Sequence, residues 1–284
     1  MALSMEAKAA VLADNLSKRL KQNKEGEELR LTYLADLAHL FADRIRSAID
    51  ASVPFQTAMA DAAEAYRSHL LQNGGDGAQF CALLSKEMRA YLKELCAMLF
   101  PLQSEVGKSI SYVSHRTADL AFSVLSERFQ GISVSYADDM REACGALIGG
   151  ECEYCLLPIE NEGVALQSTR TLLQNSGLYT VMSVHADDIR YLVLSRSLLV
   201  HSFEGEPLYM SISLPIEHLE NTVSLISLPK EEISEIYSFT LGEKNKVSLS
   251  FTLGSEASFT SALLYFAIIH KDIEITGFYQ KLEE

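Results

Sequence analysis

Basic residues are scarce in this 284-residue sequence, and tryptophan is absent. With 24 Lys and Arg residues against 38 Asp and Glu residues, the formal net charge is -14. A field of this sign repels the phosphate backbone of nucleic acids and the surface of anionic membranes. We therefore expect no nucleic-acid partner and no membrane partner. An anionic ligand would need a local group of Lys and Arg side chains, and the sequence shows no obvious cluster of them.

Long apolar runs and an ordered cysteine pattern are also missing. No apolar stretch reaches the roughly 18 residues that a membrane-spanning helix needs, and the first residues do not combine a basic region with an apolar core. These features favour a cytoplasmic protein. The five cysteines, at 81, 96, 144, 152 and 155, are odd in number and lack the spacing of a secreted disulfide framework. We expect reduced thiols.

The composition that is present is that of an ordinary globular protein, with 48% hydrophobic and 22% charged residues. Residues 1–108 are rich in Ala, Leu, Glu, Lys, Arg and Met, which favour helices. Apolar residues recur every three or four positions over 28–50 and 80–99, and a further helix begins at Pro54 and ends at the glycines near 74–77. With a leading helix expected over 4–21, this region is predicted to be a helical bundle.

From residue 109 the pattern changes to short strands that alternate with helices. Strands are expected over 110–114, 132–136 and 154–158, and helices over 119–129, 138–149 and 167–175. Such alternation predicts a mostly parallel sheet covered by helices, in a single α/β lobe over 109–200. Residues 201–207 contain a Gly and a Pro and are predicted to be a linker.

The remaining segment, 208–284, follows a different order. Strands are predicted over 209–214, 233–241, 246–253 and 273–279, helices over 216–228 and 255–269, and a hairpin turn at 242–245. This βαββαβ order is the split-βαβ, ferredoxin-like plan. The sequence therefore predicts an α+β multidomain protein with three parts.

Short motifs in the central part carry a family resemblance. An apolar strand at 152–157 runs into Pro-Ile-Glu-Asn at 158–161, a helix with Thr-Arg-Thr-Leu-Leu follows at 169–173, and Asp-Ile-Arg-Tyr at 188–191 begins a further strand. In this order they resemble the substrate-binding turn and the catalytic strand of prephenate dehydratases. The three-part organisation resembles bifunctional enzymes of phenylalanine biosynthesis that join a chorismate mutase, a two-lobed prephenate dehydratase and a C-terminal ACT regulatory domain. The strand at 273–279 is similar to the closing strand of that ACT domain.

The resemblance implies a residual substrate pocket, in which Arg190 would pair with a substrate carboxylate. The residues of this pocket are Glu160, Asn161, Arg190 and Tyr191. The resemblance also implies that the chemistry is lost, because the family's catalytic strand carries a proton-donating Thr where this chain has Ile189. Between Asn161 and Arg190 lie 28 residues, too few for the family's second lobe, so the cleft would have one wall. No catalytic residue is therefore assigned.

Nearby polar residues offer weak substitutes for the lost chemistry. The family's entry loop is rich in glycine, whereas residues 112–119 read Tyr-Val-Ser-His-Arg-Thr-Ala-Asp. Without these glycines, the backbone of the loop cannot approach a bound anion closely. His115 in this loop suggests a general acid, but a solvated histidine is the simpler interpretation. Asp187 or Asp188 would be ionised at neutral pH as a loop carboxylate.

The outer parts retain only isolated residues of the family's other sites. Arg44, Arg46 and Gln103 are candidate remnants of a mutase site, which would hold a dianion with several cations. The simpler interpretation places both arginines on a solvated helix face and Gln103 in a linker. In the ACT-like segment, Ser238 is what remains of the family's Glu-Ser-Arg-Pro regulatory motif.

A pair of cysteines has the spacing of a metal or redox site. On a strand, residues three apart point to opposite faces, so Cys152 and Cys155 would not converge on one ion. No second Cys or His pair follows at ligand spacing. We therefore expect no metal site and no cofactor.

Three hypotheses about function stay open at this point. The first is a non-catalytic relative of the family that binds an aromatic amino acid, a prephenate- or chorismate-like molecule or a protein partner, as a homodimer because ACT modules commonly associate in pairs. The second is an active chorismate mutase or prephenate dehydratase. The third is a structural or interaction protein that binds no metabolite.

Overall fold

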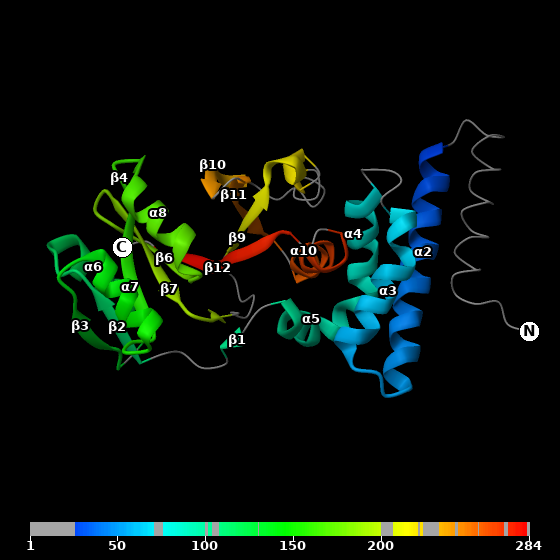
Figure 1. The fold of residues 1–284 in the computed structure, drawn as a ribbon, viewed down its shortest axis with the longest axis horizontal. Coiled ribbons are helices and arrows are strands. Elements are labelled where there is room, and N and C mark those ends of the chain that lie inside the picture. The colour runs from blue at the N-terminus through cyan, green and yellow to red at the C-terminus, as the bar shows by residue number, and fades with distance from the viewer. Residues whose placement is uncertain are drawn as a thin grey trace, which may run out of the picture. The chain divides into compact units, whose positions relative to one another are not determined.

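The computed structural model describes residues 26–70, 76–99, 102–103, 108–129, 131–199, 207–220, 222–223, 233–241, 244–254, 256–269 and 272–282. The chain divides into two compact units (Figure 1). Unit 1 comprises Met1–Leu99, Pro215–Glu232 and Gly254–Ile273, and unit 2 comprises Phe100–Leu214, Ile233–Leu253 and Glu274–Glu284. This division differs from the expected three consecutive parts, because the helices of 208–284 belong to unit 1 and its strands to unit 2. The leading helix expected over 4–21 lies outside the described residues.

Unit 1 is built from helices. They are α2 (Gly26–Asp50), α3 (Phe55–Leu70), α4 (Asp76–Met88), the 3-10 turns η1 (Arg89–Tyr91) and η2 (Ile216–His218), α5 (Leu92–Leu99) and α10 (Glu256–Ile268). The apolar stripe expected on the long first helix is confirmed, since Leu34, Leu37, Phe41 and Ile45 are at most 1% exposed. The single helix expected over 80–99 is interrupted at η1, which a three- to four-residue apolar spacing does not distinguish from a continuous helix.

Helix α10 is apolar on all sides, as expected for a helix surrounded by other elements. Phe259, Leu263, Leu264, Tyr265 and Phe266 are all buried, and α10 packs beside α4 and α5 (Figure 1). The bundle core also includes ring contacts of Phe41 with Tyr66 and with Phe80.

Unit 2 contains a ten-stranded sheet. Its strands are β2 (Ser109–Tyr112), β3 (Ser133–Tyr136), β4 (Tyr154–Asn161), β5 (Val164–Ala165), β6 (Tyr179–Ala186), β7 (Ile189–Ser195), β9 (Leu208–Pro215), β10 (Ile233–Leu241), β11 (Lys244–Leu253) and β12 (Glu274–Leu282). Their order is β10-β11-β9-β12-β6-β7-β4-β2-β3, and β5 pairs with β4. A separate short pair joins β1 (Leu102–Gln103) to β8 (Leu198–Leu199) in parallel.

The sheet is mixed: the parallel pairing expected for 109–200 is confirmed for β2, β3 and β4 and is wrong for β5, β6 and β7. Strand β2 runs parallel to β3 and β4, and β12 runs parallel to β6. The pairs β4–β7, β6–β7, β9–β12 and β10–β11 are antiparallel. The physical reason lies in the connection between β6 and β7, where Asp187 has a positive φ of 49° and the chain reverses in a tight turn. Parallel neighbours would need a crossover of a dozen or more residues.

The four strands of 208–284 form one block of this sheet in the order β12-β9-β11-β10. Strand β11 lies between β9 and β10, and β9 lies between β11 and β12, so each βαβ unit is split by a strand of the other. This is the split-βαβ strand order expected from the sequence. The block continues directly into the rest of the sheet through the β12–β6 pair.

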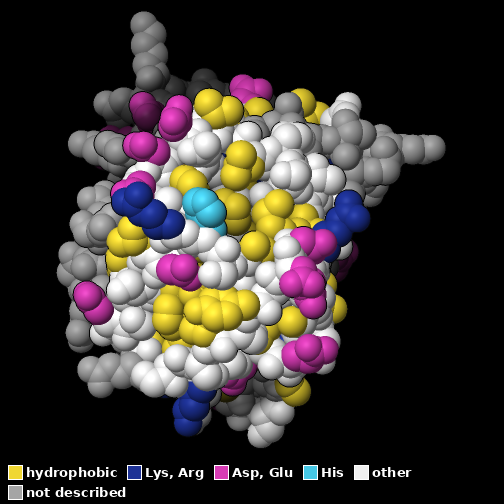
Figure 2. All heavy atoms as spheres, turned by 90° about the vertical axis from the view of Figure 1, so that its left-hand side faces the viewer, with side chains coloured by type: hydrophobic (Ala, Val, Ile, Leu, Met, Phe, Trp, Pro, Cys, Tyr) yellow, Lys and Arg dark blue, Asp and Glu magenta, His cyan; other side chains and the backbone are white. Residues whose placement is uncertain are grey.

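Three helices of unit 2 pack on the sheet and create two cores. Helix α6 (Arg116–Arg128) packs with one cluster, and α7 (Met140–Gly149) and α8 (Gln167–Ser176) pack with another. Because side chains alternate along a strand, Leu156 of β4 belongs to the first cluster and Leu157 to the second. On the face of unit 2 that Figure 2 shows, hydrophobic side chains gather between acidic ones, and basic side chains are few.

Within the described part of the chain, every helix is either too short or too polar to cross a bilayer.

Candidate functional sites

A cleft of about 420 Å3 lies where strands β2, β3 and β4 end and helices α6 and α7 begin; we call it the strand-end cleft. The polar and sequence-predicted residues among those that line it are His115, Asp138, Asp139, Asn161, Ile189 and Tyr191. The remainder of the lining is apolar and includes Val113, Leu156 and Pro158. The structure thus brings together the entry loop, the Pro-Ile-Glu-Asn turn and the start of the Asp-Ile-Arg-Tyr strand.

Hydroxyl groups at this cleft are engaged in a short network. The hydroxyls of Thr117 and Tyr191 lie 2.7 Å apart, and Thr117 Oγ1 also lies 3.0 Å from His115 Nδ1. His115 caps the N-terminus of α6, where its ring accepts a hydrogen bond from the Thr117 backbone N–H. Burial raises the pKa of Tyr191, because it disfavours the phenolate. Local structure therefore accounts for the geometry of His115.

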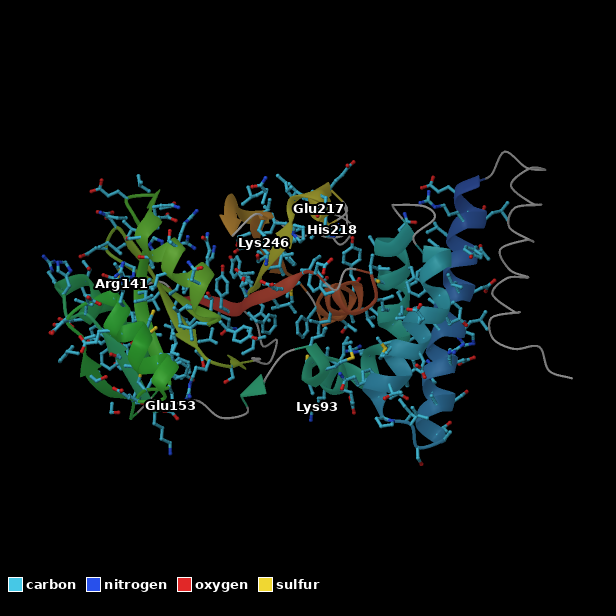
Figure 3. The ribbon with its side chains drawn as sticks, in the orientation of Figure 1. Lys93, Arg141, Glu153, Glu217, His218 and Lys246 are labelled. Carbon is cyan, nitrogen blue, oxygen red and sulfur yellow. The ribbon has the colours of Figure 1, made fainter. Side chains whose placement is uncertain are left out.

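The charged groups that line the strand-end cleft are acidic. Asp139 accepts hydrogen bonds from the backbone N–H groups of Arg141 and Glu142 at 2.7 and 2.9 Å, so it caps α7. Its neighbour Asp138 donates its backbone N–H to the Glu142 carboxylate. All residues that line the cleft belong to the described part of the chain, and neither Lys nor Arg is among them. Arg141 itself is exposed on α7 (Figure 3).

Ile189 occupies the position where the family resemblance expects a proton-donating hydroxyl. It is half-buried, lines the cleft and is the register partner of Asn161 on β4. Asp187 and Asp188 are exposed in the turn before it and are not among the residues that line the cleft. The only hydroxyl that lines the strand-end cleft within the described residues is that of Tyr191.

Arg190 and Glu160 face away from this cleft. Because neighbours along a strand point to opposite faces, Arg190 lies on the other side of the sheet from Ile189 and Tyr191. Its guanidinium pairs with the Glu160 carboxylate at 2.8 Å, and Arg190 is 6% exposed. Of the four residues predicted to form one substrate pocket, Asn161 and Tyr191 therefore line this cleft, Arg190 lines a second hollow, and Glu160 lines neither.

The second hollow is a cavity of about 300 Å3 within unit 2, which we call the serine-lined cavity. Helix α8 and strand β7 contribute Arg170, Leu173 and Arg190, and strands β9, β11 and β12 contribute Ser211, Ser213, Lys246, Ser248, Ser250 and Glu274. The chain's own C-terminal strands thus face Arg190, whereas the sequence predicted no facing wall. The lining holds three cationic side chains and one carboxylate.

Sequence reasoning missed Arg170, Lys246 and the serines of this cavity. Lys246 is 8% exposed, and its ammonium donates to the Glu274 carboxylate at 3.0 Å. The Glu274 side chain is 64% exposed, so this pair has a buried cation and a solvent-facing acid. A signal was present in the alternation of polar and apolar residues over 211–214 and 246–251, but such alternation is typical of a strand with one face in water.

The candidate mutase residues are distributed over both units. Arg46 on α2 pairs with Asp43 at 2.8 Å and with Glu87 on α4. The hydrogen bond with Glu87 raises the pKa of Arg46, and the same bond lowers the pKa of Glu87. Arg44 is half-buried in unit 1, whereas Gln103 lies in β1, which belongs to unit 2. Acidic partners within the protein therefore already hold Arg46.

The regulatory remnant lies in the C-terminal block of the sheet. Ser238 is on β10, where its register partner is Val247 on β11. Its side chain lies outside the described part, so its predicted regulatory role stays a prediction.

Three cysteines meet in the core beneath α7. The Sγ atoms of Cys144 and Cys155 lie 4.0 Å apart, and Cys152 belongs to the same cluster. Cys152 and Cys155 were expected to point to opposite faces of one strand. This expectation is wrong, because β4 begins at Tyr154 and Cys152 precedes the strand. Among the described residues, groups of three or more His, Cys, Asp or Glu side chains that could hold a metal ion do not occur.

No protein-family model matches the sequence, and no curated protein matches it. Solved structures are similar in fold. Prephenate dehydratase from Streptococcus mutans is 17% identical, with 62% of this chain and 100% of that chain covered and a TM-score of 0.50. Prephenate dehydratase from Arthrobacter aurescens, solved in complex with L-Phe, is 10% identical, with 61% and 90% covered and a TM-score of 0.47. GqqA, described as a novel type of quorum quenching acylase, is 15% identical, with 61% and 95% covered and a TM-score of 0.46.

At these identities the likeness concerns the fold alone. The Streptococcus mutans structure shows that this chain has a prephenate dehydratase-like fold over 62% of its length. The mixed α/β sheet of unit 2 agrees with that fold.

Proposed function

We propose that this chain is a prephenate dehydratase-like protein without dehydratase activity, which acts by binding a metabolite or a partner. The observation that carries this proposal is the lining of the strand-end cleft, where Ile189 replaces a hydroxyl and the charged side chains are Asp138 and Asp139. The cleft contains Asn161 and Tyr191, which the family resemblance assigns to a substrate pocket, but its lining has the wrong chemistry for the family's substrate.

Dehydration of prephenate makes two demands on such a cleft. A proton donor must lie within about 3 Å of the leaving hydroxyl, and Ile189 has no proton to give. The substrate carries two carboxylates, which require cationic or hydrogen-bonding groups in a water-excluding site. Asp138 and Asp139 would repel these carboxylates, and the cation that the resemblance assigns to them, Arg190, faces the other side of the sheet.

Chorismate mutase activity has weaker support than a non-catalytic binding role. A chorismate dianion would have to displace Asp43 and Glu87 from Arg46 before this guanidinium could bind it.

We also infer that 208–284 is an ACT-like module through which the protein forms a homodimer. The split-βαβ order of β9–β12 supports the first part of that inference.

Turnover assays of the full chain test this proposal. We expect no conversion of prephenate or chorismate above the uncatalysed rate. Prephenate turnover that disappears in Asn161→Ala would contradict the proposal, as would chorismate turnover that disappears in Arg46→Ala. These variants separate activity of this protein from that of a contaminating enzyme. Light scattering coupled to size-exclusion chromatography tests the homodimer.

A further inference from the structure

We propose that the serine-lined cavity binds a small organic acid, whose carboxylate is held by Lys246 and Arg190 and whose apolar body contacts the leucines of α8 and β7. This inference rests on the metabolite-binding role proposed above, and it gives that role a location and a ligand class. The cavity is separate from the strand-end cleft, since the two hollows share no lining residue.

Buried positive charge is the first argument. A protein with a formal charge of -14 places Arg170, Arg190 and Lys246 around one cavity of about 300 Å3. Burying a cation is costly unless an anion or hydrogen bonds compensate for the lost water. Arg190 receives such compensation from Glu160, which does not line the cavity. The partner of Lys246 is the solvent-facing Glu274, so a ligand carboxylate inside the cavity can replace or join it.

Hydroxyl groups on neighbouring strands are the second argument. Ser213, Ser248 and Ser250 are 5–7% exposed and line the cavity, as does Ser211. The hydroxyl oxygens of Ser211 and Ser250 lie 2.6 Å apart, so these two serines hydrogen-bond to each other across β9 and β11 at this side of the cavity. Buried polar groups that converge from separate strands are characteristic of a site that orients a small ligand.

The rest of the lining sets the ligand class. Leu173, Leu178 and Leu192 supply an apolar side, which inorganic phosphate would not use. The Glu274 carboxylate lies next to Lys246 and disfavours a doubly charged phosphate relative to a single carboxylate. A volume of about 300 Å3 is at the lower end of small-molecule sites, which span roughly 300–1,000 Å3. These features favour a compact acid with an apolar body.

The test compares an acid with its neutral isostere. Calorimetric titration of the full chain would use 3-phenylpropionate, benzoate and L-phenylalanine as acids, 3-phenylpropanamide as the uncharged control, and inorganic phosphate. We expect at least one acid to bind, and we expect 3-phenylpropionate to bind at least about tenfold more tightly than its amide. Failure of all three acids to bind at millimolar concentrations would overturn the proposal, as would phosphate that binds more tightly than every acid.

Two variants with opposite expected effects locate the binding. Lys246→Met should weaken binding of the acid by about tenfold or more, and Glu274→Gln should strengthen it, because the competing carboxylate is removed. The exposed side chain of Glu274 makes its variant independent of any folding defect in Lys246→Met. Lys93→Met, at an exposed position of α5 (Figure 3), is the matched control and should bind as wild type does.

The outcomes separate this inference from the function on which it rests. If an acid binds and neither Lys246→Met nor Glu274→Gln changes its affinity, the location is wrong while a non-catalytic binding protein still stands. If prephenate is turned over, the proposed function fails whatever the affinity of the serine-lined cavity.

Discussion

Gly277 on β12 and Thr180 on β6 are register partners at the seam where the C-terminal block of strands joins the rest of the sheet. A Cβ on Gly277 would lie 2.8 Å from Thr180 Cβ and 3.0 Å from the Thr180 carbonyl oxygen. The two strands can therefore approach as they do only if position 277 has no side chain. Thr180 also lines the serine-lined cavity, so this seam shapes that cavity.

Gly277→Ala should destabilise the protein by about 1–3 kcal/mol, because the added methyl overpacks a contact with backbone as well as side-chain atoms. Chemical denaturation of the full chain measures this loss. Gly145→Ala is the control, because Gly145 lies inside helix α7 with nothing within 4 Å of an added Cβ. That change should stabilise by about 0.5–1 kcal/mol through helix propensity. Equal stability of wild type and Gly277→Ala would show that β12 and β6 do not pair as described.

Ile189→Thr should leave the protein without prephenate dehydratase activity. The substitution returns a hydroxyl to the strand-end cleft, but the acidic lining at Asp138 and Asp139 still repels a dicarboxylate. The measurement is prephenate turnover by the variant. A triple variant that also carries Asp138→Asn and Asp139→Asn tests whether repulsion by these two carboxylates keeps the substrate out of the cleft. Activity in Ile189→Thr alone would mean that the missing hydroxyl was the sole defect.

Thr117→Val should cost more stability than Tyr191→Phe. The first change leaves the buried Tyr191 hydroxyl without its partner at 2.7 Å, a loss of about 1–3 kcal/mol. The second leaves Thr117 in contact with His115, so the cost should be about 1 kcal/mol. The double variant should lose less than the sum of the two, which a double-mutant cycle by denaturation measures. Additive losses would mean that the two hydroxyls do not interact.

The sequence predicted the positions of most elements well because local patterns determine them. The strand over 233–241 has the expected bounds, and the stripe on α2 is buried as its spacing predicts. The serine-lined cavity could not be predicted in this way. Arg190 and Lys246 meet through pairings between strands distant in the sequence, and the alternation around Ser248 has the same pattern as a water-facing strand. Which face of a strand meets a cavity is a property of the assembled sheet.

The ion pair of Glu87 with Arg46 predicts a dependence of stability on pH. The Arg46 guanidinium holds the pKa of Glu87 below its ordinary value, which is about 4.3 in an unfolded chain. A lowered folded-state pKa means that the stabilisation is fully present above the unfolded value and is lost as the pH falls through the folded value. Glu87→Gln should therefore be less stable than wild type at neutral pH, and the difference should shrink below about pH 4.

The size of this effect follows from exposure. Both side chains of the pair are 35% exposed, so water screens it and the difference at neutral pH should be less than about 1 kcal/mol. Urea denaturation of both proteins across the acidic range measures it. Glu94→Gln, at an exposed position of α5 outside this cluster, is the matched control and should follow the wild-type curve. A Glu87→Gln difference that stays constant down to the lowest pH would show that packing, and not ionisation, makes the contribution.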